Sequence, residues 1–304
     1  MFNIFKREKV NIPPAGLIPS PRDHRDVLTS EIFPLPVRIA SDFPPPFDLT
    51  ILNQGQTPHC VGYSSATIKQ EKELRERNSL VFDGDWIYSE CKKIDNYSGR
   101  GTYLRVAMKV LQKTGAKPKD EAGSEAIKYR IGGYAKVDDL SFEGLKKAIY
   151  VNGALLAGFI GSNQGWQTSY VKPSKSGEET WGHAVALIGY NKNYIIGQNS
   201  WGNWGDGGLF YVSKDYMPFE AWAILTDLPL EFLPTSSLEG WVAQEYLRTD
   251  NFMIGSEVYP YTRLNIRKEP NGEKILTLDK NQKCIVASEP IVSGNYHWVK
   301  VKVI

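Results

Sequence analysis

The hydrophobic pattern of this chain changes its period once, near the middle of the sequence. In the first half, three proline-free stretches have the residue spacing of helices: 60–78, 102–114 and 141–151. Pro58 stands just before the first stretch, Gly115 follows the second, and Ser141 is a favourable N-cap for the third. The second half is dominated by short runs rich in Val, Ile and Tyr. The sequence therefore predicts a helical half followed by a β half.

Prolines mark the regions outside this predicted domain. Nine of the 18 prolines fall in residues 1–46, and each fixes φ and lacks a backbone donor. We expect an extended arm there, too interrupted for the helices of an inhibitory segment, so that the protein acts without its removal. The segment that begins at Pro229 predicts a connector over 229–250. Residues 251–304 predict a small all-β module, which leaves 47–228 as the main domain.

Composition and charge exclude several classes of protein. The 36 basic and 34 acidic side chains give a net charge of +2, so neither nucleic acid nor a membrane surface is expected as a partner. No apolar run approaches the ~20 residues of a membrane helix, and the N-terminus lacks the apolar core of a secretory signal. The three cysteines form no disulfide framework or metal-ligand pair, so we expect no metal and no cofactor. The predicted location is cytoplasmic, with release by lysis or carriage in a virus particle as alternatives.

A predicted hairpin places a histidine beside an asparagine. Its two strands flank the turn residues Asn-Lys-Asn and cover 183–190 and 194–199. If the turn is centred on Lys192, the residue numbers of cross-strand partners sum to 384, and His183 faces Trp201. Asn199 is then a diagonal neighbour of His183 on the same face. A histidine ring held by an amide is the oriented base of a nucleophilic site.

Cys60 is the candidate nucleophile for this base. It begins the first predicted helix, where the helix dipole and a neighbouring imidazolium would both lower the pKa of its thiol. Gln54 lies six residues earlier, and its side-chain amide could donate to an oxyanion together with the backbone N–H of Cys60. The residues thus predict a thiol nucleophile with an imidazole base.

Three sequence blocks resemble the papain-like cysteine peptidases over roughly residues 30–228: Gln54-Gly-x-x-x-x-Cys60, Gly182-His-Ala-Val185, and Gln198-Asn-Ser-Trp-Gly202 with Trp204-Gly-Asp-Gly207. The resemblance implies an α+β fold with a helical half, a β half and the site between them. It implies peptide-bond hydrolysis through a thioacyl-enzyme, with Cys60 as nucleophile and His183 as base and then acid. Asn199 would orient the histidine, and Gln54 would donate to the oxyanion.

The same resemblance suggests substrate-binding positions and some departures. Gly101 would let the substrate backbone lie close, Trp201 would shield the His–Asn pair from water, and Trp181 would line the main specificity pocket. His59 replaces a small residue of the family, and we leave open whether it tunes the site or is a spectator. Val61 replaces the usual Trp, and the upstream disulfide cysteine of the family is absent.

The C-terminal residues 251–304 resemble a bacterial Src-homology-3-like barrel. The resemblance rests on Leu264-Asn-Ile-Arg267, Pro270 and Trp298-Val-Lys-Val301. It implies a cell-wall or protein ligand for this module. Two other functions therefore stay open beside a peptidase: a peptidoglycan hydrolase targeted by the barrel, and a structural or virion-attachment protein that retains a peptidase fold.

Overall fold

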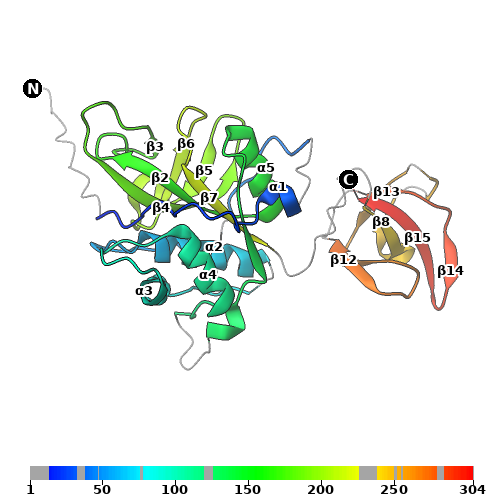
Figure 1. Ribbon diagram of the computed structural model, residues 1–304. Coiled ribbons are helices and arrows are strands. Elements are labelled where there is room, and N and C mark those ends of the chain that lie inside the picture. The colour runs from blue at the N-terminus through cyan, green and yellow to red at the C-terminus, as the bar shows by residue number, and fades with distance from the viewer. Residues whose placement is uncertain are drawn as a thin grey trace, which may run out of the picture. The chain divides into compact units, whose positions relative to one another are not determined.

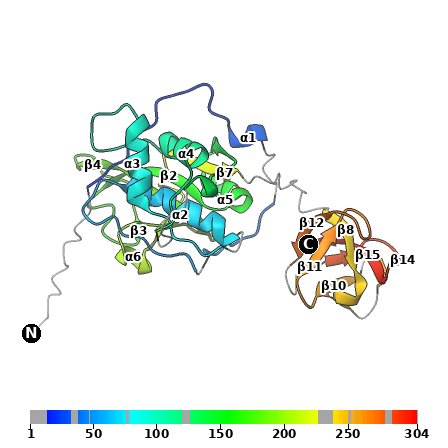
Figure 2. The same ribbon diagram turned by 90° about the horizontal axis from the view of Figure 1, so that it is seen from below.

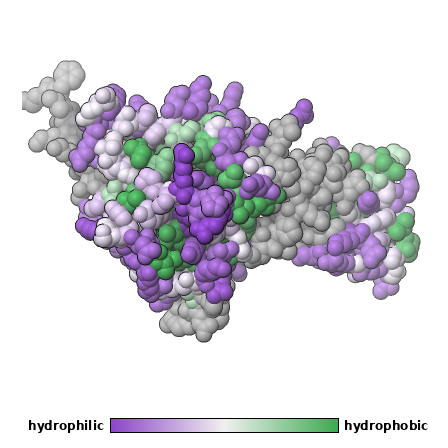
Figure 3. All heavy atoms as spheres, viewed as in Figure 1, coloured by the Kyte–Doolittle hydropathy of each residue, from purple (hydrophilic) through white to green (hydrophobic). Residues whose placement is uncertain are grey.

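The computed structural model describes residues 14–32, 38–46, 48–75, 78–119, 126–225, 238–249, 252–254, 256–278 and 284–303. The chain forms two compact units, Met1–Leu228 and Pro229–Ile304 (Figure 1). Hydrophilic side chains cover much of the face seen in Figure 3. No helix in the described ranges has the length and apolar character needed to cross a membrane.

The helices of the first unit include the three that the sequence predicts. Those three are α2 (Cys60–Arg75), α4 (Leu104–Lys113) and α5 (Phe142–Asn152). The predicted N-cap is confirmed, since the hydroxyl of Ser141 accepts the N–H of Gly144 at 3.1 Å. Helix α3 (Gly84–Ile94) was not predicted from the sequence; Asp83 caps it by accepting the N–H of Trp86. Shorter helical segments are α1 (Thr29–Ile32), η1 (Ala126–Tyr129) and α6 (Trp204–Gly207).

A seven-stranded sheet forms the β half, in the order β1-β7-β2-β4-β5-β6-β3. Its strands are β1 (Gly133–Lys136), β2 (Leu155–Ser162), β3 (Tyr170–Val171), β4 (Thr180–Tyr190), β5 (Ile195–Gln198), β6 (Leu209–Val212) and β7 (Glu220–Leu225). The predicted hairpin register is confirmed, since Ala186 pairs with Gln198 and Leu187 with Gly197. A bulge between Leu187 and Gly189 shifts the pairing by one residue closer to the turn.

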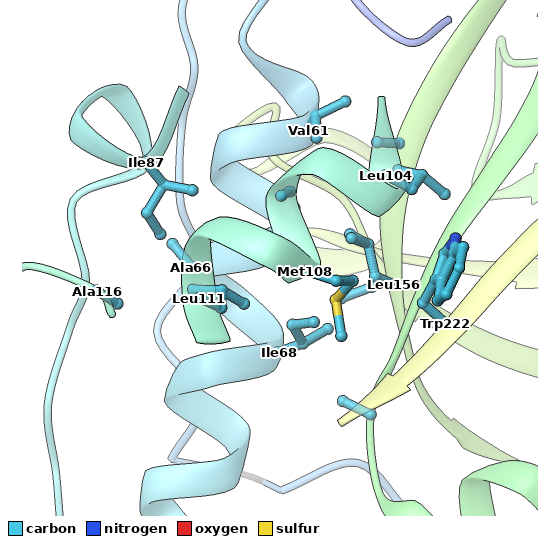
Figure 4. Packing of buried hydrophobic residues seen from close by; sticks show 14 of the residues in the cluster. Val61, Ala66, Ile68, Ile87, Leu104, Met108, Leu111, Ala116, Leu156 and Trp222 are labelled. Atoms are coloured by element: carbon cyan, nitrogen blue, oxygen red, sulfur yellow. The ribbon is translucent and has the colours of Figure 1, made fainter. Parts of the chain in front are cut away.

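Helices α2, α3 and α4 pack on one another and form a layer against the sheet (Figures 1 and 2). Figure 4 shows Ile68 of α2 and Met108 of α4 beside Leu156 of β2 and Trp222 of β7. Because α2 is covered on most of its sides, even polar residues along it are buried. The packing of α2 against β4 fixes where its first residue, Cys60, lies.

The second unit is one sheet with the order β12-β11-β8-β15-β13-β10-β9, and β14 pairs with β15. Its elements are β8 (Leu238–Ala243), η2 (Gln244–Tyr246), β9 (Leu247–Arg248), β10 (Glu257–Pro260), β11 (Leu264–Arg267), β12 (Lys274–Leu278), β13 (Cys284–Val286), β14 (Ile291–Ser293) and β15 (Tyr296–Val303). Among the described residues the pairing path ends at β12 and β9 without closing, so the predicted barrel is not confirmed.

The predicted connector over 229–250 is wrong for its second part. Strand β8 pairs with β15 along its whole length, from Leu238 opposite Val303 to Ala243 opposite Trp298. Residues 229–237 lie outside the described residues. Trp241 and Val242 have high β propensity, which is a strand signal that the nearby prolines obscured. The second unit therefore includes strand residues well before position 251.

Candidate active site

His183 and Asn199 are joined by a buried hydrogen bond. The ring Nε2 of His183, on β4, lies 2.8 Å from Oδ1 of Asn199, the residue directly after β5. The same Oδ1 accepts the backbone N–H of Ser200 at 2.8 Å, so it faces two donors and Nε2 carries the ring proton. This leaves Nδ1 of His183 as the basic nitrogen. The Trp201 ring lies over the imidazole, with 4.6 Å between ring centroids.

Cys60 lies at the start of α2, against the strand that carries His183. The Ser64 hydroxyl donates to the carbonyl of Ala184 at 2.8 Å and ties the first turns of α2 to β4. Cys60 is fully buried, and backbone groups of Ala184 and Gly16 hydrogen-bond to its thiol. The structure thus places the thiol beside the residue that follows His183.

Burial determines the protonation of the Cys60 thiol and of the His183 ring in this structure. It raises the pKa of the Cys60 thiol, more than the backbone hydrogen bonds from Ala184 and Gly16 lower it. Burial also lowers the pKa of His183 to about 4, against the opposite effect of the bond to Asn199. Both groups are therefore neutral near pH 7. The expected lowering of the thiol pKa by the helix dipole and an imidazolium is wrong for this state, because desolvation outweighs it.

Gln54 is held beside the segment that follows Asn199. Its Nε2 donates to the carbonyl of Thr57 at 2.7 Å, and its Oε1 accepts the hydroxyl of Ser200 at 2.7 Å. Its backbone N–H donates to the carbonyl of Ser200 at 2.8 Å. A primary amide has two N–H groups, and Thr57 takes one of them. The fold therefore orients this amide just ahead of the first turn of α2.

The N-terminal arm lies across Cys60. Thr102 donates its N–H to the carbonyl of Gly16 at 2.9 Å, and Ile18 donates to the carbonyl of Thr102 at 3.0 Å. Leu17 donates to the carbonyl of Gly182 at 3.2 Å, and its bridge to Thr102 is parallel. A Cβ atom on Gly16 would lie 1.7 Å from the carbonyl oxygen of Pro58. A backbone segment without a side chain thus fills the space over the thiol, which argues against our expectation that the protein acts without removal of the arm.

The side chain of Leu17 fills an apolar pocket next to this crossing. A Cβ on Gly158 would lie 2.6 Å from Cδ2 of Leu17, and the side chains of Leu104 and Phe219 reach the same point. Leu17 is buried. Farther along the arm, the N–H of Ser20 donates to the carboxylate of Glu220 at 3.0 Å. The arm therefore shows which surface beside Cys60 accepts an extended peptide.

Gly101 lies where close approach of a backbone requires a glycine. A Cβ atom there would lie 2.8 Å from the carbonyl oxygen of Gly16 and about as close to the side chain of Ile18. The hydrogen bonds to the arm, however, come from the next residue, Thr102, which the sequence analysis did not single out. Its position directly after Gly101 is the signal that could have indicated it.

Trp181 belongs to a cluster of tryptophans that packs around the ring of His183. Its ring lies 5.6 Å from that of Trp166 and 6.1 Å from that of Trp201, and its Nε1 donates to Asn163 at 2.9 Å. The side chains that meet Leu17 beside Gly158 are those of Leu104 and Phe219. Trp166, fully buried and also close to Trp204, is a further member that the sequence analysis missed.

His59 is held on the side of α2 that faces α3. Its Nδ1 lies 2.7 Å from Asp85, which also accepts the hydroxyl of Tyr63 at 2.9 Å, and its ring stacks on Tyr88 at 3.7 Å. These contacts hold its ring against α3. Over the described residues, no three His, Cys, Asp or Glu side chains gather in a way that could hold a metal ion.

Comparisons with known proteins agree with this arrangement. Residues 58–222 match the family described as papain family cysteine protease. Xylellain, a cysteine protease from Xylella fastidiosa, has a similar fold, with a TM-score of 0.61 and 22% identity over 73% of this chain and 98% of that one. The Carica candamarcensis cysteine protease CMS1MS2, solved in complex with E-64, gives a TM-score of 0.50 and 17% identity over 62% and 100% of the two chains. An uncharacterized peptidase C1-like protein of Acanthamoeba polyphaga mimivirus is 28% identical over an alignment of 223 positions, and the match covers 59% of this chain and 70% of that protein.

Proposed function

The chain belongs to the papain family of cysteine proteases, since the family match spans more than half of its residues, and we propose that it cleaves peptide bonds through a thioacyl-enzyme on Cys60. The observation that carries this mechanism is the buried His183–Asn199 hydrogen bond on the strand that packs against Cys60. An amide-held imidazole beside a thiol at a helix start is the arrangement of an activated cysteine nucleophile.

The proposed reaction has two halves. Sγ of Cys60 attacks the scissile carbonyl carbon while Nδ1 of His183 takes the thiol proton. His183 then gives this proton to the leaving amine, and the C–N bond breaks to leave a thioester. In the second half, His183 takes a proton from water, whose oxygen attacks the thioester carbon. The proton returns to the sulfur as the acid product leaves.

Asn199 and Gln54 have supporting roles in this scheme. The Oδ1 of Asn199 holds the Nε2–H side of the ring, so that Nδ1 stays available to the thiol. The amide of Gln54 and the backbone N–H of Cys60 donate to the oxyanion of each tetrahedral intermediate. Ser200 and Thr57 hold the Gln54 amide, so little of its rotamer entropy would be lost during the reaction.

The arm indicates how a substrate would bind. A substrate peptide would hydrogen-bond to Thr102 and to the carbonyl of Gly182 in place of the arm. A leucine-sized apolar side chain would enter the pocket that Leu17 occupies. Because substrate and arm need the same surface, hydrolysis requires the arm to leave it.

Labelling with E-64, the compound bound in the Carica candamarcensis protease structure, tests the proposal. The intact protein is incubated with the compound, and the modified cysteine is identified by peptide mass mapping. We expect modification of Cys60, with Cys91 and Cys284 unmodified, and parallel loss of hydrolysis of a fluorogenic leucyl peptide. Release of soluble fragments from peptidoglycan at a rate that exceeds peptide hydrolysis would favour the wall hydrolase instead.

For the second unit we propose a ligand-binding role. A cavity of about 260 Å³ is lined by Tyr246, Tyr296 and Trp298 together with Arg263 and Arg267. Aromatic faces with neighbouring guanidinium groups suit a cell-wall or protein ligand that offers flat apolar groups and negative charge. Co-sedimentation of the intact protein with peptidoglycan, compared for the parent and Tyr296→Ala, tests this role. Equal sedimentation of both would contradict it.

A further inference from the structure

The ammonium group of Lys92 lies inside the loop that leads to Thr102. Lys92 belongs to the last turn of α3, and the loop covers residues 95–101 between α3 and α4. Its Nζ lies close to four oxygen atoms: Oδ2 of Asp95 at 2.7 Å and the carbonyls of Tyr97 at 2.7 Å, Gly99 at 2.9 Å and Gly101 at 3.0 Å. The Lys92 ammonium group therefore contacts backbone carbonyls along the loop from Tyr97 to Gly101.

The loop curls around this cation, with bends at Gly99 and Arg100. Carbonyls two residues apart, at positions 97, 99 and 101, turn to Lys92, while the carbonyl of Arg100 between them accepts the hydroxyl of Tyr88. Asp95, whose side chain is only 1% exposed, neutralises the ammonium and also accepts the N–H of Tyr97 at 3.0 Å. Bonds from a charged donor are stronger than neutral ones, so this set defines the loop geometry.

The contact with Gly101 fixes the direction of the neighbouring N–H. The carbonyl of Gly101 and the N–H of Thr102 belong to one planar trans peptide group, in which they point in opposite directions. Lys92 holds the carbonyl oxygen on the inner side of the loop. The N–H of Thr102 must then point outward, and there it donates to the arm at Gly16.

We propose that Lys92 is a positioning residue for substrate, because it aims the Thr102 N–H at the backbone of a bound peptide. The inference rests on the proposed function, in which substrate replaces the arm along this edge. Lys92 itself touches no substrate in this scheme. It acts through the Gly101–Thr102 peptide group, and an uncharged side chain of similar length cannot replace it, because the gathered carbonyls would lose their donor.

Two reagents for the same sulfur atom separate this role from general damage to the fold. E-64 is the peptide-like reagent that needs the edge at Thr102, whereas iodoacetamide needs only an uncovered thiol. Both need the arm to leave Cys60, so the ratio of their rate constants does not depend on how often the arm is displaced. The ratio is measured at Cys60 by mass mapping in the intact chain, for the parent, Lys92→Met and the control Lys93→Met.

Lys93 is a matched control on the same helix turn. Its side chain is 65% exposed and pairs with Glu90 on the surface. We expect the ratio of E-64 to iodoacetamide labelling to fall roughly tenfold in Lys92→Met, the loss associated with one charge-assisted hydrogen bond. In Lys93→Met it should stay within about twofold of the parent, since an exposed pair contributes little.

An unchanged ratio in folded Lys92→Met would overturn the inference. If Lys92→Met does not fold, Asp95→Asn decides, because it keeps the shape of the side chain at position 95 and removes the charge that holds the ammonium. We then expect a smaller fall in the same ratio, and an unchanged ratio would again overturn the inference. Failure of the proposed function is a different result: E-64 would not label Cys60 of the parent, although iodoacetamide did.

Discussion

The two units each contain a buried cysteine and a histidine that is hydrogen-bonded through its ring, yet only one unit brings such a pair together. In the first unit, Cys60 packs against the strand of His183. In the second, Cys284 lies opposite Val303, six residues along β15 from His297, which corresponds to about 20 Å of extended strand.

The polar partners of the two histidines also differ. His183 is buried and bonded to a neutral amide, whereas His297 is 62% exposed and lies 3.0 Å from the Glu245 carboxylate. Burial raises the pKa of Cys284 to about 11. The comparison teaches that burial by itself makes a thiol inert. Reactivity requires a buried base beside the thiol and a way for the site to open.

The largest expected effect is loss of hydrolysis in Cys60→Ala. Members of a nucleophile–base pair act as a unit, so kcat/KM for a fluorogenic peptide should fall at least about 10³-fold. Cys284→Ala in the second unit and Cys91→Ala in the core of the first should retain the parent's value. Activity of Cys60→Ala within tenfold of the parent would break the comparison between the two units.

The second effect is on stability at acid pH. The pKa of His183 is about 4 in the folded chain and near 6.5 when unfolded, so the unfolded state binds the extra proton first. The stabilisation is therefore present above pH 6.5 and is lost as the pH falls towards 4, by about 2 kcal/mol at pH 5. Thermal unfolding of the first unit, followed from pH 7 to pH 4, measures it.

The two histidines provide the matched variants for this measurement. His183→Gln should show a weaker loss of Tm between pH 7 and pH 4 than the parent, while His297→Gln should keep the parent's slope. Identical slopes in all three proteins would mean that His183 does not stay neutral in the folded chain.

A smaller effect is expected when the arm is displaced. In Gly16→Ala the new Cβ would lie 1.7 Å from the backbone oxygen of Pro58, so this segment cannot keep its place over Cys60. Iodoacetamide labelling of Cys60 should accelerate about tenfold, since the buried thiol gains access to water and to the reagent. Cys284 should stay unlabelled, because it is buried in the core of the second unit.

Ala15→Ser is the control for this variant, because Ala15 is exposed in the same segment. It should label Cys60 at the rate of the parent. If the parent already labels as fast as Gly16→Ala, the arm does not protect the thiol, and our expectation that the protein acts without removal of the arm would hold.

The smallest effect should follow from removal of the second unit. A chain that ends at residue 228 should keep kcat/KM for a short peptide within about threefold, because the site residues all belong to the first unit. The cut belongs there rather than near residue 250, since β8 would otherwise lose its partner β15. A truncated chain that is folded by circular dichroism but a hundredfold less active would show that the units are not independent.

Much of the fold and of the site could be predicted from local sequence. The helices at Cys60, Leu104 and Phe142 follow from flanking residues and proline-free stretches. The register at Ala186 and Gln198 follows from turn length, and it brings Asn199 to His183. Strand β8 was missed because it is short and follows prolines, and helix α3 because it begins at a glycine, Gly84.

By itself, the sequence determined the family and the order of the site residues, because helix starts, turns and motif spacings depend on residues close together in the chain. Only the tertiary structure decided that Gly16 lies over Cys60, that burial raises the pKa of this thiol, and that Lys92 directs the peptide group before Thr102. These features depend on contacts between segments far apart in sequence and on exclusion of water. Neither of these is encoded in a local pattern.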